Sequence, residues 1–149
     1  MKPRTEARGL ALQVLYEYDL SGHPAGEILM NRLQEEPRDE GMIDFAKQIM
    51  NGVIPISKKL DAMIAENAPE WPLDQISSID KNIIRIALWE FAVSKITPIK
   101  VAINEAVELA KVYGSDSSPR FVNGVLGSLS TQVAKIASMF TDDNTIIKE

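Results

Sequence analysis

The sequence contains no cysteine and only one histidine, His23. The lack of cysteine excludes disulfides, thiolate nucleophiles and cysteine-based zinc sites, and it fits a reducing cytoplasm. His23 stands between Gly22 and Pro24 in a predicted loop, and there is no second histidine to complete a metal site. We therefore predict that the chain binds no metal ion.

Sequence patterns for membrane insertion, export and phosphate binding are also missing. The most apolar stretch, residues 83–93, is interrupted by Arg85 and Glu90, whereas a membrane-spanning helix needs roughly 20 apolar residues. Residues 1–6 are charged and lack the apolar core of a signal peptide. The patterns GxxxxGK, GxGxxG and GxSxG do not occur. We expect a cytoplasmic protein with no membrane segment and no cofactor.

Charge is unevenly distributed along the chain. Its 16 Lys and Arg against 21 Asp and Glu give a formal net charge of −5, which suits a basic protein partner better than non-specific binding to a polyanion. Residues 1–8 nevertheless hold Lys2, Arg4 and Arg8 against Glu6 alone. A basic end on an acidic body suggests two different partners, although chance on a solvated terminus explains the pattern equally well.

Apolar residues recur at helical spacing along most of the chain, and no stretch alternates with a period of two. The predicted fold class is all-α, with about seven helices in two packed helical subdomains. The helix with Ile83, Ile84 and Leu88 on its apolar face is expected at the centre of the fold. The expected helices cover residues 7–18, 26–36, 42–53, 60–64, 77–91, 98–113 and 118–136.

Prolines mark the breaks between these predicted helices. Pro55 is expected to kink or break the third helix. Residues 67–74 contain two further prolines around Trp71, whose indole is expected to anchor a connector. We therefore place the subdomain boundary between residues 1–68 and residues 69–149.

Polar residues predict where several helices begin. Ser77 followed by Asp80 three residues later resembles a capped helix start. Thr97 is expected to cap the next helix, with Pro98 in its first turn. Residues 141–149 are expected to form a loose tail.

One stripe of the first helix combines cations with an aromatic ring. Arg4, Arg8 and Tyr16 fall on this stripe with Leu12, beside the apolar face. Such an arrangement can bind phosphates and stack a base. A solvated stripe, with Tyr16 covering the edge of the core, explains the pattern equally well.

A polar loop at residues 116–121 meets the start of the last predicted helix. Backbone N–H groups at a helix N-terminus can receive a phosphate. Arg120 would add positive charge there, and Phe121 would offer a face on which a base can stack. Packing of Phe121 in the core is the competing interpretation.

Three stretches resemble the NusB family. The longest is KVAINEAVELAKVYGSDSSPRFVNGVL at residues 100–126, accompanied by DKNIIRIALWEF at residues 80–91 and ARGLALQVLYEYD at residues 7–19. The resemblance covers nearly the whole chain and is weakest over residues 22–39 and after Val133. It implies two helical subdomains and a role in processive transcription antitermination of ribosomal RNA operons.

The same resemblance implies partners and binding residues. Family members pair with NusE, a small-subunit ribosomal protein, to bind single-stranded boxA RNA within the RNA polymerase antitermination complex, and some members are homodimers. Thr5 and Glu6 stand where the family often has further arginines, so strong RNA binding is expected to depend on the partner. The implied RNA-binding residues are Lys2, Arg4, Arg8, Tyr16, Asp116, Arg120 and Phe121, and the implied NusE-facing residues are Asp74 and Asp80.

Two other functional classes deserve comparison. RNA cytosine methyltransferases carry a NusB-like domain, but their chemistry requires a cysteine that this chain lacks. Glu105 and Glu108 share one flank of a predicted helix, as ordinary solvent-facing charges do, so we predict that the chain is not an enzyme. A helical protein-binding adaptor without intrinsic RNA affinity is the alternative that the acidic net charge allows.

Overall fold

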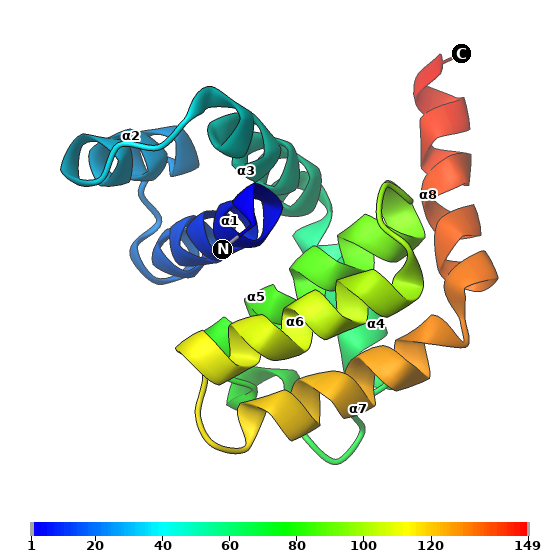
Figure 1. Cartoon of the computed structure of the whole chain (residues 1–149). Coiled ribbons are helices and arrows are strands. Elements are labelled where there is room, and N and C mark those ends of the chain that lie inside the picture. Colours follow the sequence, from blue (N-terminus) through cyan, green and yellow to red (C-terminus); the bar gives the residue numbers. More distant parts are fainter. Residues whose placement is uncertain (1, 149) are drawn as a thin grey trace.

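The architecture is entirely helical in the part of the chain that the structure describes. This computed structural model describes the backbone of residues 2–148 and the side chains of residues 2–140. Because residues 2–148 contain no strand, the all-α prediction is confirmed. The α-helices, shown in Figure 1, are α1 (Pro3–Ser21), α2 (Ala25–Glu35), α3 (Glu40–Val53), α4 (Ser57–Glu66), α5 (Ser78–Leu88), α6 (Ile99–Tyr113), α7 (Ser118–Ser130) and α8 (Val133–Lys148).

Three short helical turns complete the chain path. The turn η1 (Ile54–Ile56) separates α3 from α4, which confirms the break predicted at Pro55. The turn η2 (Leu73–Gln75) precedes α5. The turn η3 (Trp89–Val93) extends α5 as a π-helix, in which the N–H of Ser94 donates to the carbonyl of Trp89 at 2.9 Å. π-Helical turns are rare and often lie beside functional sites.

Helix α5 forms the centre of the packing, as predicted. It contacts α1, α3, α4, α6 and α7, and Ile83, Ile84 and Leu88 are completely buried. Figure 1 shows α2 on the outside of the N-terminal helices, and α2 packs on α1. One continuous cluster of buried apolar residues extends from α1 to α8. The two halves of the chain therefore share a core.

A buried charge network joins α1, α4 and α5. Arg85 Nη1 donates to Asp19 Oδ2 at 2.8 Å, and Arg85 Nε donates to Asp61 Oδ1 at 2.7 Å. Burial acts to lower the pKa of the Arg85 guanidinium, but the hydrogen bonds and negative charges of Asp61 and Asp19 outweigh it and raise the pKa above its ordinary value. Arg85 is therefore a permanently charged link between the first half of the chain and the second.

Helix α4 lies with the C-terminal helices, although the predicted boundary assigns it to the N-terminal subdomain. Helix α4 packs against α5 and α7, and Figure 1 shows it among the C-terminal helices. The division between residues 1–68 and 69–149 stays a prediction, and the packing of α4 favours a boundary before Ser57.

Several predicted helix limits need correction. The cap predicted at Thr97 is wrong, because Thr97 is buried and its hydroxyl donates to Glu90 Oε1 at 2.7 Å, while Pro98 occupies the cap position of α6. The last predicted helix is interrupted before Val133 and becomes α7 and α8. The loose tail is also wrong up to Lys148, where α8 ends; the last residue lies outside the described residues. The predicted start at Ser77 is confirmed, since its Oγ accepts from the N–H of Asp80 at 3.0 Å.

Gly52 allows α3 to approach the indole of Trp89, and this contact yields a stability prediction. A Cβ atom at position 52 would overlap the ring of Trp89, which is itself buried. We expect Gly52→Ala to destabilise the protein by about 1–3 kcal/mol because the core is overpacked. Gly127→Ala is the matched control, since Gly127 lies in α7 with open space around it, and alanine should stabilise a helix there by up to about 1 kcal/mol. Urea unfolding measures both, and equal effects would refute the close-approach explanation.

Candidate nucleic-acid interface

A cavity of about 730 Å³ opens where α1, the connector after α4, the start of α5 and the α6–α7 loop meet. It combines aromatic rings with one cation and one carboxylate, and we call it the aromatic cavity. Because these elements are far apart in sequence, only the tertiary fold assembles it. The lining residues used below are Tyr16, Leu20, Trp71, Asp80, Tyr113, Arg120 and Phe121.

Trp71 and Phe121 form an aromatic pair in this cavity. Their ring centroids lie 6.3 Å apart at an interplanar angle of 79°, an edge-to-face arrangement. Phe121 is half-buried and packs against the core, whereas Trp71 is 52% exposed. The structure thus shows that Phe121 packs partly against the core and also lines the cavity, and stacking of a base on its ring stays a prediction.

The loop between α6 and α7 is held by internal hydrogen bonds. The N–H of Ser115 donates to Ser118 Oγ at 2.9 Å, and Ser118 is almost completely buried. The N–H of Phe121 donates to the carbonyl of Ser117 at 3.1 Å. These bonds fix the first turn of α7, which carries exposed Arg120 beside Phe121. Arg120 forms no ion pair with the described residues, so its charge is available to an anion.

Asp80 places a carboxylate in the lining of the aromatic cavity. Its backbone N–H is capped by Ser77, but its buried Oδ1 has no hydrogen-bond partner among the described side chains. A buried polar atom without a partner is costly unless something outside the chain satisfies it. Asp80 therefore leaves one buried acceptor atom unsatisfied among the described residues.

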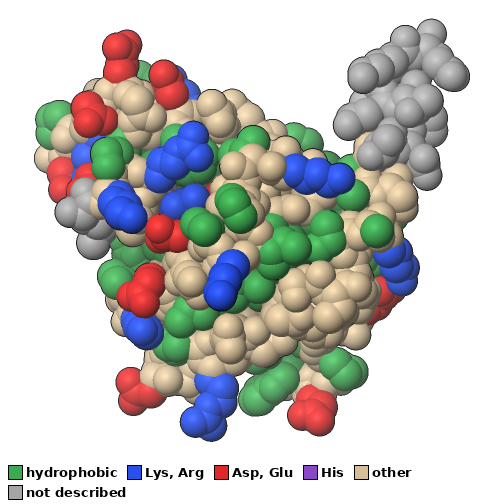
Figure 2. All heavy atoms as spheres, turned by 45° about the vertical axis from the view of Figure 1, so that its right-hand side comes forward, with side chains coloured by type: hydrophobic (Ala, Val, Ile, Leu, Met, Phe, Trp, Pro, Cys, Tyr) green, Lys and Arg blue, Asp and Glu red, His purple; other side chains and the backbone are tan. Residues whose placement is uncertain are grey.

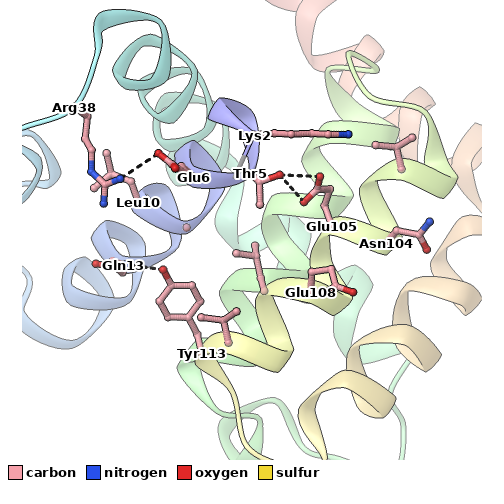
Figure 3. A pocket seen from close by; sticks show the side chains of 14 residues that line it. Lys2, Thr5, Glu6, Leu10, Gln13, Arg38, Asn104, Glu105, Glu108 and Tyr113 are labelled. Carbon is pink, nitrogen blue, oxygen red and sulfur yellow. Dashed lines mark hydrogen bonds and ion pairs between the residues drawn. The ribbon is translucent and has the colours of Figure 1, made fainter.

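A second cavity, of about 530 Å³, lies between α1 and α6. Figure 3 shows Lys2 and the Arg38–Glu6 ion pair at its edges, and we call it the α1–α6 cavity. Tyr113 lines both cavities, and its hydroxyl accepts a hydrogen bond from Gln13 Nε2 at 2.8 Å. Tyr113 thus forms the boundary between a mixed-charge cavity and the aromatic cavity.

The surface around α6 is mixed in character. Helix α6 exposes Ile99, Val101 and Val112. Figure 2 shows hydrophobic side chains gathered in a band across the middle of one face, with Lys and Arg side chains spread around it. The face therefore offers apolar contact area and scattered positive charge rather than one continuous basic patch.

The three basic residues at the N-terminus differ in their environments. Lys2 and Arg4 are exposed, and the guanidinium of Arg4 lies 4.5 Å from the centroid of the Phe45 ring. Arg8 is only 4% exposed and its Nη2 lies 2.8 Å from Oε1 of Glu90, which is 1% exposed. Arg8 is thus a buried residue of the fold.

The NusB family model matches residues 5–131, which is most of the chain. The chain belongs to the NusB family. The transcription antitermination protein NusB of Dehalococcoides mccartyi strain CBDB1 is 45% identical over 135 residues, covering 91% of this chain and 94% of that protein. The protein of the same name from Bacillus subtilis strain 168 is 39% identical over 133 residues, covering 89% of this chain and 98% of that protein.

Solved structures agree with this membership of the NusB family. NusB of T. maritima is 30% identical, with a TM-score of 0.77 over 92% of this chain and 94% of that chain. A chain in the crystal structure of antitermination factors NusB and NusE in complex with dsRNA is 26% identical, with a TM-score of 0.77 over 86% of this chain and 96% of that chain. The all-helical NusB-like fold predicted from the sequence is therefore confirmed.

The structure brings together some, but not all, of the residues that the NusB resemblance implied. Tyr16, Arg120 and Phe121 line the aromatic cavity together with Asp80, which was predicted for a different partner. The other implied residues lie outside this cavity: Lys2 and Arg4 at the start of α1, and Asp74 and Asp116 exposed on nearby segments. Three of the seven predicted RNA-binding residues and one of the two predicted NusE-facing residues thus line the same cavity.

The expected exposed stripe on α1 is wrong at two positions. Arg8 and Leu12 are both buried, because α1 packs against α3 on one side and α5 on the other. The available signal was Glu90, an acidic residue within the most apolar stretch of the chain. A charge in such a stretch predicts a buried partner of opposite sign.

Sequence reasoning missed three residues of the aromatic cavity. Trp71 was expected to anchor the connector, yet about half of its surface is exposed beside Phe121. Leu20 and Tyr113, the other two, end helices whose apolar faces point to the core, so periodicity gave no reason to single them out. The sequence shows a tryptophan between two prolines, and only the structure shows that its ring is exposed.

Two further classes of site were sought among the described residues. They contain no group of three or more His, Cys, Asp or Glu side chains placed to hold a metal ion. In the same part of the chain, no helix is both long and apolar enough to cross a membrane.

Proposed function

We propose that this chain binds RNA in processive transcription antitermination, together with a NusE-type ribosomal protein. The observation that carries the proposal is the convergence of Tyr16, Arg120 and Phe121 on one cavity, although Tyr16 lies more than 100 positions from the other two in sequence. Aromatic faces beside a free cation suit single-stranded RNA, whose bases can stack while phosphates meet the charge. Membership of the NusB family supports the same role.

The protein partner is proposed for the Asp80 side of the same cavity. Exposed Leu20 and Trp71 supply apolar area in this cavity, and Asp80 has an unpartnered carboxylate oxygen. This chain is structurally similar to a chain of the crystal structure in which NusB and NusE are in complex with dsRNA. A basic partner would suit the net charge of −5. Asp74, exposed in η2, is proposed to extend this contact.

The proposed role is binding within the RNA polymerase antitermination complex in the cytoplasm, without catalysis. Asp116, on the loop before α7, is proposed to accept hydrogen bonds from RNA bases. A homodimer that covers the RNA-binding face is a proposed resting form. Methyl transfer to RNA is the enzymatic alternative, and detectable transfer by the purified chain would contradict the proposal.

Filter binding of single-stranded boxA-like RNA, with and without NusE, tests the proposal directly. Because Arg8 is buried, we do not expect it to contact a phosphate. The expected phosphate contacts are therefore those of Lys2, Arg4 and Arg120. Three contacts predict that log affinity falls against log salt with a slope of about −2. If no RNA is bound in either condition while NusE is bound, the chain is a protein-binding adaptor and the RNA proposal fails.

Charge reversal at Asp80 tests the partner side of the cavity. We expect Asp80→Lys to weaken NusE binding by roughly tenfold or more at low salt, since a buried like charge then faces a basic partner, and the loss should shrink as salt rises. Asp44→Lys is the matched control, because Asp44 is exposed on α3 and does not line the aromatic cavity. Calorimetric titration measures both. Equal affinities for Asp80→Lys and wild type at low salt would exclude this face.

A further inference from the structure

The most deeply buried ion pair in the described residues joins α1 to the π-helical turn η3. Arg8 Nε donates to Glu90 Oε2 at 2.9 Å, and Arg8 Nη2 donates to Glu90 Oε1 at 2.8 Å. The two residues are 82 positions apart. Both side chains are more than nine-tenths buried. This two-pronged geometry fixes the relative position of the two elements as well as neutralising both charges.

Additional polar groups hold this pair in place. Thr97 Oγ1 donates to Glu90 Oε1 at 2.7 Å, which explains why Thr97 does not cap α6. Glu105 of α6 lies 3.5 Å from Arg8 Nη1 and also accepts a hydrogen bond from Thr5 Oγ1 at 3.0 Å. Arg8 thus connects α1 to both η3 and α6, and its charge is offset by two carboxylates.

Phe45 links buried Arg8 to exposed Arg4. The guanidinium carbon of Arg8 lies 5.4 Å from the centroid of the Phe45 ring, and that of Arg4 lies 4.5 Å from the same centroid. Phe45 belongs to α3 and is 5% exposed. Arg4 forms no ion pair with the described residues, so its charge is free while its guanidinium is oriented by the ring.

We propose that Arg8 is a positioning residue for RNA binding and contacts no phosphate itself. Through Glu90 and Phe45 it holds the first turns of α1 so that Arg4 presents its guanidinium at the surface. The inference rests on the proposed RNA-binding function, and it separates two arginines that the sequence pattern placed on one stripe. In this proposal Arg4 binds a phosphate of the RNA, and Arg8 fixes the position of the Arg4 side chain.

The salt dependence of RNA binding distinguishes the two roles. Arg4→Ala should flatten the slope of log affinity against log salt by about 0.7, the value for one lost phosphate contact on a single strand. The double variant Arg8→Met/Glu90→Leu, made in the Arg4→Ala background, should flatten the slope no further, because it removes a pair that no phosphate touches. Apolar residues of similar volume often replace a buried ion pair without loss of stability, so this variant is expected to fold. A further flattening of about 0.7 in that background would overturn the proposal.

Arg8→Lys separates positioning from a purely structural role. Lysine keeps the charge but cannot reproduce the two-pronged contact with Glu90. Measured where circular dichroism shows the variant to be folded, RNA affinity should fall roughly fivefold, since loss of the fork lets α1 and Arg4 shift, and this loss should disappear in the Arg4→Ala background. Wild-type affinity in folded Arg8→Lys would overturn the positioning role.

Side-chain NMR gives a second readout that needs no substitution. On addition of single-stranded boxA-like RNA, the Nε–H signal of Arg4 should shift, whereas that of Arg8 should keep its position and its protection from exchange. A larger shift at Arg8 than at Arg4 would contradict the inference. If wild-type protein binds no RNA with or without NusE, the proposed function itself fails and this inference fails with it. Where wild-type protein binds RNA, negative results for the Arg4 and Arg8 variants concern this inference alone.

Discussion

Replacing Glu90 by alanine is expected to destabilise the protein by about 3–5 kcal/mol, the cost of leaving a buried charge without its partner. Arg8 would lose the carboxylate that accepts its Nε and Nη2 hydrogens, and Thr97 would lose its acceptor. Glu105, at 3.5 Å from Nη1 and with a partly exposed side chain, compensates only in part. Urea unfolding measured by circular dichroism provides the test.

Two control variants make the Glu90 result specific. Arg8→Met/Glu90→Leu should recover most of the lost stability, because neither charge then remains in the core. Glu108→Ala should leave stability nearly unchanged, since Glu108 is exposed and its pair with Lys111 lies on the surface. A loss below about 1 kcal/mol in Glu90→Ala, typical of an ordinary surface position, would contradict the burial of this pair.

Truncation of Phe121 is expected to have the largest effect on RNA binding. Phe121→Ala should weaken binding by about 1–3 kcal/mol, or roughly 5- to 150-fold, because one base loses its stacking surface. The slope of log affinity against log salt should stay nearly constant, since stacking releases few ions. Arg120→Gln should instead flatten that slope by about 0.7. Fluorescence anisotropy with labelled boxA-like RNA at several salt concentrations separates the two effects.

Stability must be measured alongside RNA binding for Phe121. The ring packs partly against the core and against Trp71, so its truncation should cost less than the roughly 3–5 kcal/mol of a fully buried phenylalanine. Phe121→Leu serves as a control that retains apolar packing but removes the aromatic face. If Phe121→Ala is destabilised yet binds RNA normally where it is folded, Phe121 is a core residue and the RNA lies elsewhere.

Much of the fold was predictable because helix formation is governed by local patterns. The 3.6-residue period of apolar side chains indicated which segments are helical. It did not indicate how α5 is buried, because Ile86 and Trp89, which the period places off the apolar face, are buried as well. Pro55 and Ser77 marked a break and a start through backbone geometry and capping, which act within a few residues. The break between α7 and α8 was not predicted from the sequence, because neither Thr131 nor Gln132 is a proline or a glycine.

The candidate site was only partly predictable. Arg120 and Phe121 were identified because they lie together at a helix start and within a stretch that resembles the NusB family. Trp71 was missed because a single tryptophan in a connector has the same local pattern whether it packs inward or lines a cavity. Its 52% exposure depends on α1 and α7, which flank the connector without filling the space beside its indole.

By itself, the sequence determined the helical class, most helix limits and membership of the NusB family, since periodicity, capping and motif spacing are properties of neighbouring residues. Only the tertiary structure decided that Arg8 is buried while Arg4 is exposed. The two arginines are four positions apart on one helix, and the difference arises from Glu90, which lies 82 positions from Arg8. A buried charge is stable only where a group of opposite charge lies beside it. Here the tertiary packing of α1 against η3 places Glu90 beside Arg8.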